Sequence, residues 1–146
     1  MRGHAELSRV WPRDRRLRLV GALHDHDPGR NARAYGLLLV HREAPERRLH
    51  YPGGLKGTAF DVSCPVADLA PDDLPLPAVW DLYLAPDPAA DPADALRVGK
   101  VLDDISGKKK IMVYPAQPLT RPGGTARVRP YFTIKDNLSV GVTATP

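Results

Sequence analysis

The stretch VWDLYL, Val79–Leu84, indicates the fold class of this chain. Its apolar and polar side chains alternate, which places Trp80, Leu82 and Leu84 on one side and Asp81 on the other. A period of two residues is typical of a β-strand with one buried and one exposed face. Prolines and aspartates lie near both ends of the stretch, as expected where strands give way to turns. We therefore expect a strand here, with its polar side chains facing solvent.

The same alternation recurs along the chain, and no segment has a sustained helical period. Turn-forming Gly, Pro, Asn and Asp separate the candidate strands at spacings of about 8–12 residues. This pattern predicts an all-β fold, an antiparallel immunoglobulin-like β-sandwich of about nine short strands. The candidate strands are residues 17–24, 36–42, 47–51, 58–64, 79–84, 96–101, 110–114, 126–134 and 138–143.

Length and composition indicate one domain. The chain has 146 residues, 42% hydrophobic and 26% charged, which is typical of a globular protein. No apolar run reaches the roughly 20 residues that cross a bilayer, and the basic N-terminus lacks the apolar core of a secretory signal. We expect a loose N-terminal segment over residues 1–14 and a single β-sandwich domain over residues 15–146. We also expect a cytoplasmic location and no membrane insertion.

The single cysteine, Cys64, excludes an internal disulfide and a zinc site built from cysteines. Cys64 continues the alternation of Phe60 and Val62, so we interpret it as a small core residue rather than a nucleophile.

The net charge of +4 is unevenly distributed along the sequence. No Lys or Arg occurs between Gly57 and Leu96, and all the basic residues lie before or after that acidic stretch. A folded chain could gather them into a positive face that attracts anionic partners. The alternative is a solvated surface of uneven sign.

Motifs for metal, nucleotide or covalent chemistry are weak. His24 and His26 would face the same side of a strand, but spacing fixes no third ligand, so we expect a solvated loop and no metal or cofactor. Ser-Gly-Lys at 106–108 resembles part of a phosphate loop. That motif needs a glycine where Leu102 stands and a hydroxyl residue where Lys109 stands. The match therefore fails.

The C-terminal third offers a more specific candidate surface. Strand geometry predicts that Arg127, Arg129 and Tyr131 share an exposed face, and that Lys110 and Tyr114 face the same way on the preceding strand. Arginines bind phosphate through paired donors, and tyrosine rings stack on sugar faces. The alternative is an ordinary outer sheet face whose basic residues prevent edge pairing. The candidate ligand-binding residues are Lys108, Lys109, Lys110, Tyr114, Arg127, Arg129 and Tyr131.

Three stretches resemble a known accessory domain: VWDLYLAP, LRVGKVLDDISGKKKIMVYPAQ and VRPYFTIKDNLSV. They are similar to the β-sandwich found C-terminal to family 2 glycosyltransferases, including wall-teichoic-acid glycosyltransferases and related actinobacterial enzymes. In such domains a strand like Leu17–His24 opens the sandwich. Strands like Val79–Leu82, Arg129–Thr133 and Asn137–Val140 follow it, so the likeness covers about residues 15–143.

The resemblance implies a non-catalytic immunoglobulin-like module that helps to bind polymer or to assemble an enzyme into oligomers. This sequence departs from the pattern because no nucleotide-sugar-binding fold and no metal-binding Asp-x-Asp precede the sandwich. We expect a stand-alone domain that acts beside a transferase or has been recruited to other work.

Three hypotheses follow. The first is a non-catalytic binding module for an anionic glycan or polyol-phosphate, or for a partner glycosyltransferase, with no role in nucleic-acid binding. The second is a small biosynthetic enzyme, of the transferase, cyclase or isomerase kind, whose acid–base group lies in a sandwich pocket. The third is a structural homo-oligomer anchored by Tyr83 and Tyr131. The candidate catalytic residues of the second hypothesis are His24, His26, His41 and Asp81.

Overall fold

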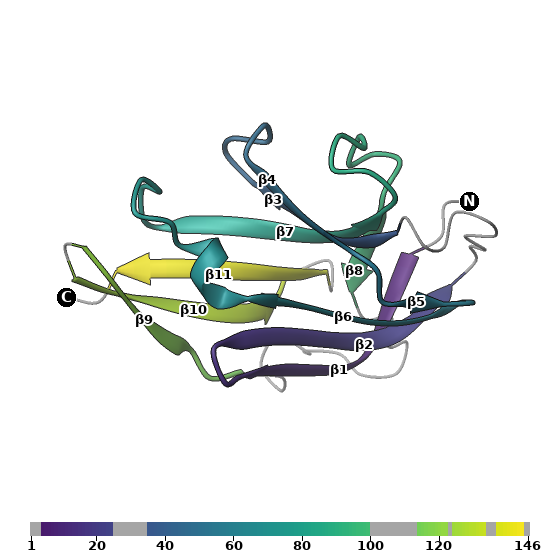
Figure 1. Ribbon diagram of the computed structural model, residues 1–146, viewed down its shortest axis with the longest axis horizontal. Helices are drawn as coiled ribbons and strands as arrows, with labels where there is room; N and C mark the ends of the chain where they lie inside the picture. Colours follow the sequence, from purple (N-terminus) through teal and green to yellow (C-terminus); the bar gives the residue numbers. More distant parts are fainter. Residues whose placement is uncertain (1–3, 25–34, 100–113, 123, 134–136, 145–146) are drawn as a thin grey trace.

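The computed structural model describes residues 4–24, 35–99, 114–122, 124–133 and 137–144. These residues form two β-sheets that pack face to face, which confirms the prediction of an all-β sandwich (Figure 1). The first sheet contains β1 (His4–Arg13), β2 (Arg16–His24), β5 (Leu55–Lys56) and β6 (Ala59–Pro65). The second contains β3 (Gly36–His41), β4 (Arg48–Pro52), β7 (Ala78–Ala85), β9 (Gln117–Arg121), β10 (Gly124–Phe132) and β11 (Leu138–Ala144).

One further strand, β8 (Leu96–Gly99), joins the two sheets into a continuous hydrogen-bonded path. Leu96 and Arg97 pair with β7 in an antiparallel sense, whereas Val98 and Gly99 pair with β1 in a parallel sense. The predicted antiparallel pairing holds between the other described strands, and the parallel contact of β8 with β1 makes the sheet mixed.

The expectation of a loose N-terminal segment is corrected by β1, which pairs with β2 from His4 to Arg13. Sequence alternation fails there because the register shifts between Leu7 and Arg9. The side chain of the extra residue, Ser8, donates a hydrogen bond of 3.0 Å to the carbonyl of Val20. Such a bulge places two successive residues opposite one and so hides the period of two.

The strand predictions elsewhere match the structure closely, with β5 and β9 as additional short strands. In β7 and β10 buried and more exposed residues alternate as expected. Of the predicted strand 110–114, only Tyr114 lies within the described residues, and it is not part of a strand.

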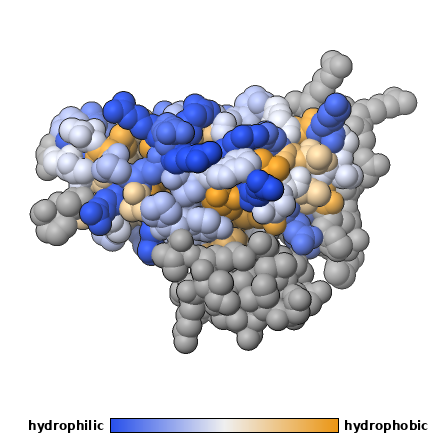
Figure 2. All heavy atoms as spheres, turned by 90° about the horizontal axis from the view of Figure 1, so that it is seen from below, coloured by the Kyte–Doolittle hydropathy of each residue, from blue (hydrophilic) through white to orange (hydrophobic). Residues whose placement is uncertain are grey.

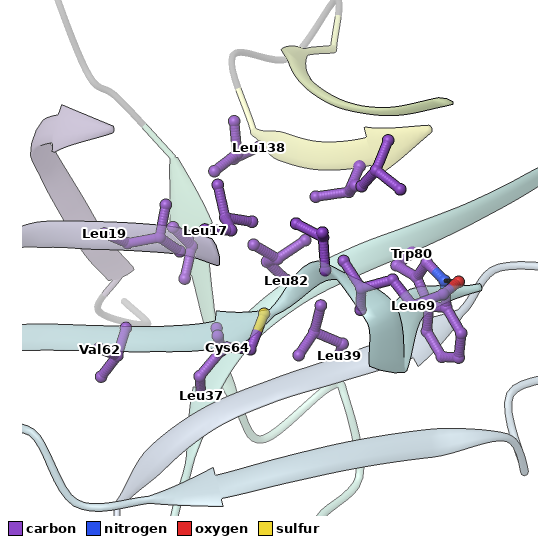
Figure 3. Packing of buried hydrophobic residues seen from close by; sticks show 14 of the residues in the cluster. Leu17, Leu19, Leu37, Leu39, Val62, Cys64, Leu69, Trp80, Leu82 and Leu138 are labelled. Carbon is purple, nitrogen blue, oxygen red and sulfur yellow. Dashed lines mark hydrogen bonds between the residues drawn. The ribbon is translucent and has the colours of Figure 1, made fainter. Parts of the chain in front are cut away.

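The core lies between the sheets and contains leucines from both, with Trp80 at one end (Figure 3). Trp80 is 1% exposed, and its indole Nε1 donates a hydrogen bond of 2.9 Å to the carbonyl of Leu69. Leu69 ends a short 3-10 helix, η2 (Val66–Leu69), that covers this end of the core. Cys64 is buried in the same core, and burial raises the pKa of its thiol to about 12, so the interpretation as a core residue is confirmed.

The turn between β1 and β2 is tied to the opposite sheet by a single buried side chain. Asp14 and Arg15 both have positive φ, of 58° and 62°, and link the strands through a tight hairpin. The side-chain amide of Gln117 in β9 accepts a hydrogen bond from the Arg15 N–H and donates one to the Arg16 carbonyl, each 2.8 Å long. Gln117 therefore fixes the position of this turn relative to β9.

Candidate functional site

A groove of about 480 Å³ lies on the outer face of β10 and β11. Its lining is Tyr114, Ala116, Arg127, Arg129, Tyr131, Gly141 and Thr143, and we call it the arginine groove. The structure therefore brings together four of the residues predicted from sequence to bind a ligand. Lys108, Lys109 and Lys110 lie outside the described residues.

The register of the β10–β11 hairpin explains why the surface is hollow. Arg127 stands opposite Thr143, Arg129 opposite Gly141, and Tyr131 opposite Ser139. A Cβ added at Gly141 would lie 3.5 Å from the ring of Tyr131, so this ring leans over the glycine. Sequence reasoning missed Gly141, although its place opposite Arg129 can be read from a hairpin pairing of the last two strands.

Arg127 and Arg129 differ from most other arginines of the sandwich in what surrounds them. Both are exposed at successive outward positions of β10, about 7 Å apart along the strand. Neither forms an ion pair or side-chain hydrogen bond with another residue in the part of the chain that the structure describes. Two guanidinium groups in a groove thus keep their donors available for an external acceptor.

Tyr114 closes the groove where the pairing of β9 with β10 ends, at Gln117 and Val128. Its ring packs against the core residue Phe132, with ring centroids 6.2 Å apart and planes inclined at 48°. Burial raises the pKa of its phenol, so the side chain is neutral at physiological pH. Tyr114 supplies an aromatic wall held in place by the core, and its packing corrects the expectation that it faces only solvent.

Beside the arginine groove the same sheet face carries a cluster of paired charges, which we call the Asp81 cluster: Arg42, Asp81, Arg97 and Ser139. The Asp81 carboxylate accepts hydrogen bonds of 2.7 Å from Arg42, 3.2 Å from Arg97 and 2.7 Å from the Ser139 hydroxyl. Burial by itself would raise the pKa of Asp81. The hydrogen bonds from Arg42 and Ser139 and the charge of Arg97 outweigh burial and lower this pKa below its usual value.

Arg97 lies where the edge of β7 changes partner. β11 pairs with β7 as far as Asp81, and β8 takes over at Tyr83, so Leu82 stands at a fork between two strands. Arg97 bridges this fork by donating hydrogen bonds of 2.9 Å and 2.6 Å to the carbonyls of Leu82 and Leu138. Its guanidinium also stacks 5.1 Å from the centre of the Tyr83 ring. The cluster therefore holds the sheet together.

Two of the candidates for acid–base chemistry, His41 and Asp81, have structural partners. His41 is 7% exposed, and its Nδ1 accepts hydrogen bonds from the backbone N–H groups of Glu43 and Ala44. Its ring also packs edge-on against Trp80, with centroids 5.4 Å apart. The Asp81 carboxylate accepts hydrogen bonds from two arginines and from the Ser139 hydroxyl. These contacts account for both residues without a reaction.

The histidine pair is only partly described. His24 ends β2, and His26 lies outside the described residues. Among the described residues no group of three or more His, Cys, Asp or Glu side chains is arranged to hold a metal ion. None of the helices formed by these residues has the length and hydrophobicity to cross a membrane.

The fold defines this chain as an all-β sandwich, and two solved structures share it. One is S. aureus TarS 217–571, with a TM-score of 0.69, 15% identity, and coverage of 100% of this chain and 40% of that chain. The other is S. aureus TarS, with a TM-score of 0.65, 16% identity, and coverage of 97% and 25%. At these identities the likeness establishes the shared fold, and this chain spans less than half of either protein.

Comparisons of the sequence alone give no further assignment. No protein-family model matches the chain. No curated protein matches it either.

Proposed function

We propose that this chain is a non-catalytic, glycosyltransferase-associated accessory module that binds an anionic glycan or polyol-phosphate chain in the arginine groove. The observation that carries the proposal is the pair of exposed arginines, Arg127 and Arg129, that lack protein partners among the described residues and share a groove with two tyrosines.

The shared fold supports the association with a glycosyltransferase. TarS is a wall teichoic acid glycosyltransferase, and the sandwich of this chain superposes on part of its structure over the whole length of this chain. A fold can host many functions, so the ligand must be argued from the groove itself.

The chemistry of the groove favours phosphate groups on a polyol or sugar backbone. Each guanidinium can donate two parallel hydrogen bonds to one phosphate, and the strand spacing lets Arg127 and Arg129 take successive groups of one chain. The rings of Tyr114 and Tyr131 offer apolar faces to the carbon backbone between those groups. A neutral glycan would leave both guanidinium groups without an ionic partner.

The test is a binding titration of a fluorescently labelled ribitol-phosphate oligomer at low salt, with Arg127→Ala/Arg129→Ala against the unchanged protein. We expect the double variant to bind at least about tenfold more weakly, because each charge-assisted hydrogen bond contributes about 1.5 kcal/mol or more before solvent screening. The matched control, Arg47→Ala/Lys56→Ala, removes the same formal charge away from the groove. Equal losses in the two double variants would contradict the proposed site.

Direct docking to a partner glycosyltransferase is the second candidate. This chain covers 40% of TarS 217–571, so in that protein the sandwich is one part of a longer chain. That arrangement favours docking as the second candidate. If the unchanged protein binds no ribitol-phosphate oligomer at low salt, the polymer hypothesis fails and this candidate is preferred.

A further inference from the structure

The arginine groove does not end at the edge of its sheet. Ala116, which lines it, also lines a larger hollow of about 670 Å³ between β9 and the β1–β2 turn, which we call the edge hollow. Arg13 and Asp14 line the edge hollow and also a third hollow of about 200 Å³ on the outer face of the other sheet. Each of the three hollows thus shares lining residues with the next one. Together they lead from one face of the sandwich to the other.

The edge hollow is formed by fixed parts of the structure. Its walls include Pro12, Arg15, Gln117 and Pro118. Gln117 is 9% exposed and binds the backbone of the consecutive residues Arg15 and Arg16, so the turn keeps its place against β9. The passage between the two faces therefore does not depend on a loose loop.

The third hollow, which we call the Trp11 hollow, combines an aromatic ring with arginines. Its lining is Trp11, Arg13, Asp14, Arg16, Arg18 and Ser63. Arg18 stacks 4.6 Å from the Trp11 ring centre while it binds Asp61 through two hydrogen bonds, which fixes the ring and one wall. Arg16 instead donates to the Ser63 hydroxyl at 2.9 Å and has no ion pair with a described carboxylate.

Charge along this path is mainly positive. Arg15 and Arg16 lack carboxylate partners among the described residues, as Arg127 and Arg129 do. Arg13 approaches Asp14 only at 4.0 Å, with both side chains more than 70% exposed, and solvent screens such a pair. Figure 2 shows the molecule from the side of β1. Hydrophilic side chains cover much of the face seen there, and the largest apolar area lies in the right half of the view.

We propose that the arginine groove, the edge hollow and the Trp11 hollow form one track, along which a single extended polyanionic chain passes from one face of the sandwich to the other. This inference rests on the proposed function and deepens it, because it defines the ligand as a long chain rather than a single anionic group. A short oligomer fills the arginine groove alone, whereas a long one also reaches Arg13, Arg15 and Arg16.

The experiment compares ribitol-phosphate oligomers of increasing length, from the dimer upward, in titrations with the full chain. The track predicts that affinity rises with length beyond the short oligomer that fills the arginine groove. The variant Arg13→Ala/Arg15→Ala should bind a long oligomer about tenfold more weakly than the unchanged protein does. Its affinity for the dimer, which fills the arginine groove alone, should equal that of the unchanged protein. Both side chains are exposed, and the backbone contacts of Gln117 remain, so the variant should keep its fold; its thermal unfolding verifies this.

The matched control is Arg47→Ala/Lys56→Ala, which removes the same charge from positions outside all three hollows. Comparable losses in the two double variants would overturn the track. So would an affinity that does not depend on oligomer length. In either case the proposed function would stand if the dimer still bound and Arg127→Ala/Arg129→Ala weakened that binding. If no oligomer bound at all, both the track and the proposed function would be contradicted.

Discussion

Two groups of arginines on one sheet face have opposite surroundings. In the Asp81 cluster, Arg42 and Arg97 share one carboxylate, and Arg97 also fills the fork between β8 and β11. In the neighbouring arginine groove, Arg127 and Arg129 have no such partner among the described residues. The same side chain therefore has a structural role in one place and is available to a ligand in the other. What separates the roles is the set of partners.

The largest expected effect concerns the Asp81 cluster. We expect Asp81→Asn to lower the free energy of unfolding by about 3 kcal/mol, because it leaves the largely buried Arg97 guanidinium without its counter-charge. Urea denaturation measures this change. Asp73→Asn, which breaks an ion pair whose carboxylate is 73% exposed, is the matched control and should cause no resolvable change. A small loss for Asp81→Asn would mean that hydrogen bonds to the carbonyls alone hold Arg97.

The next effect concerns the shape of the arginine groove. Gly141→Leu places a side chain under the Tyr131 ring and fills the floor between Arg129 and Thr143. We expect about tenfold weaker binding of a ribitol-phosphate oligomer, or about 1.4 kcal/mol. The matched variant Gly141→Ala meets only ordinary van der Waals contact and should bind like the unchanged protein. Normal binding by Gly141→Leu would place the ligand elsewhere.

Acidification should reduce the contribution of the Asp81 cluster to the free energy of unfolding. Because the folded pKa of Asp81 is lowered, its stabilising contribution is present above the ordinary aspartate pKa of about 3.9 and is lost as the pH falls through the folded value. The difference in unfolding free energy between the unchanged protein and Asp81→Asn should therefore shrink below about pH 4. Urea denaturation across this range tests the sign. A difference that grows with acidity would contradict the lowered pKa.

The smallest effect concerns an exposed pair on the opposite sheet. Arg18 and Asp61 form two hydrogen bonds, yet each side chain is about half exposed. We expect Asp61→Asn to leave the unfolding midpoint unchanged within error, since surface ion pairs contribute little. A clear loss would show that geometry alone, without burial, makes an arginine structural in this fold.

Much of the sandwich could be predicted from sequence, because alternation in stretches such as Val79–Leu84 depends only on which residues are apolar. The outward face of Arg127, Arg129 and Tyr131 followed from the same rule. β1 was missed because its register shift between Leu7 and Arg9 breaks the alternation. β9, QPLTR, is short and carries a proline, so it gives little signal of its own.

The partners of Asp81 could not be read from the sequence. Arg42, Arg97 and Ser139 come from segments that are far apart along the chain and meet only where β3, β8 and β11 surround β7. Alternation correctly placed Asp81 outside the core, but no local pattern shows that two arginines neutralise it. The distinction between paired and unpaired arginines is thus a property of the topology.

The central claim is that the unpaired arginines on β10 receive the ligand. Titration of the labelled protein with a short ribitol-phosphate oligomer, followed by backbone amide chemical shifts, tests it most directly. We predict shifts that concentrate in β10 and β11 around Arg127, Arg129 and Gly141, with the amides around Asp61 and Asp73 unchanged. Shifts that spread evenly over all exposed arginines, or that leave β10 and β11 unaffected, would contradict the claim.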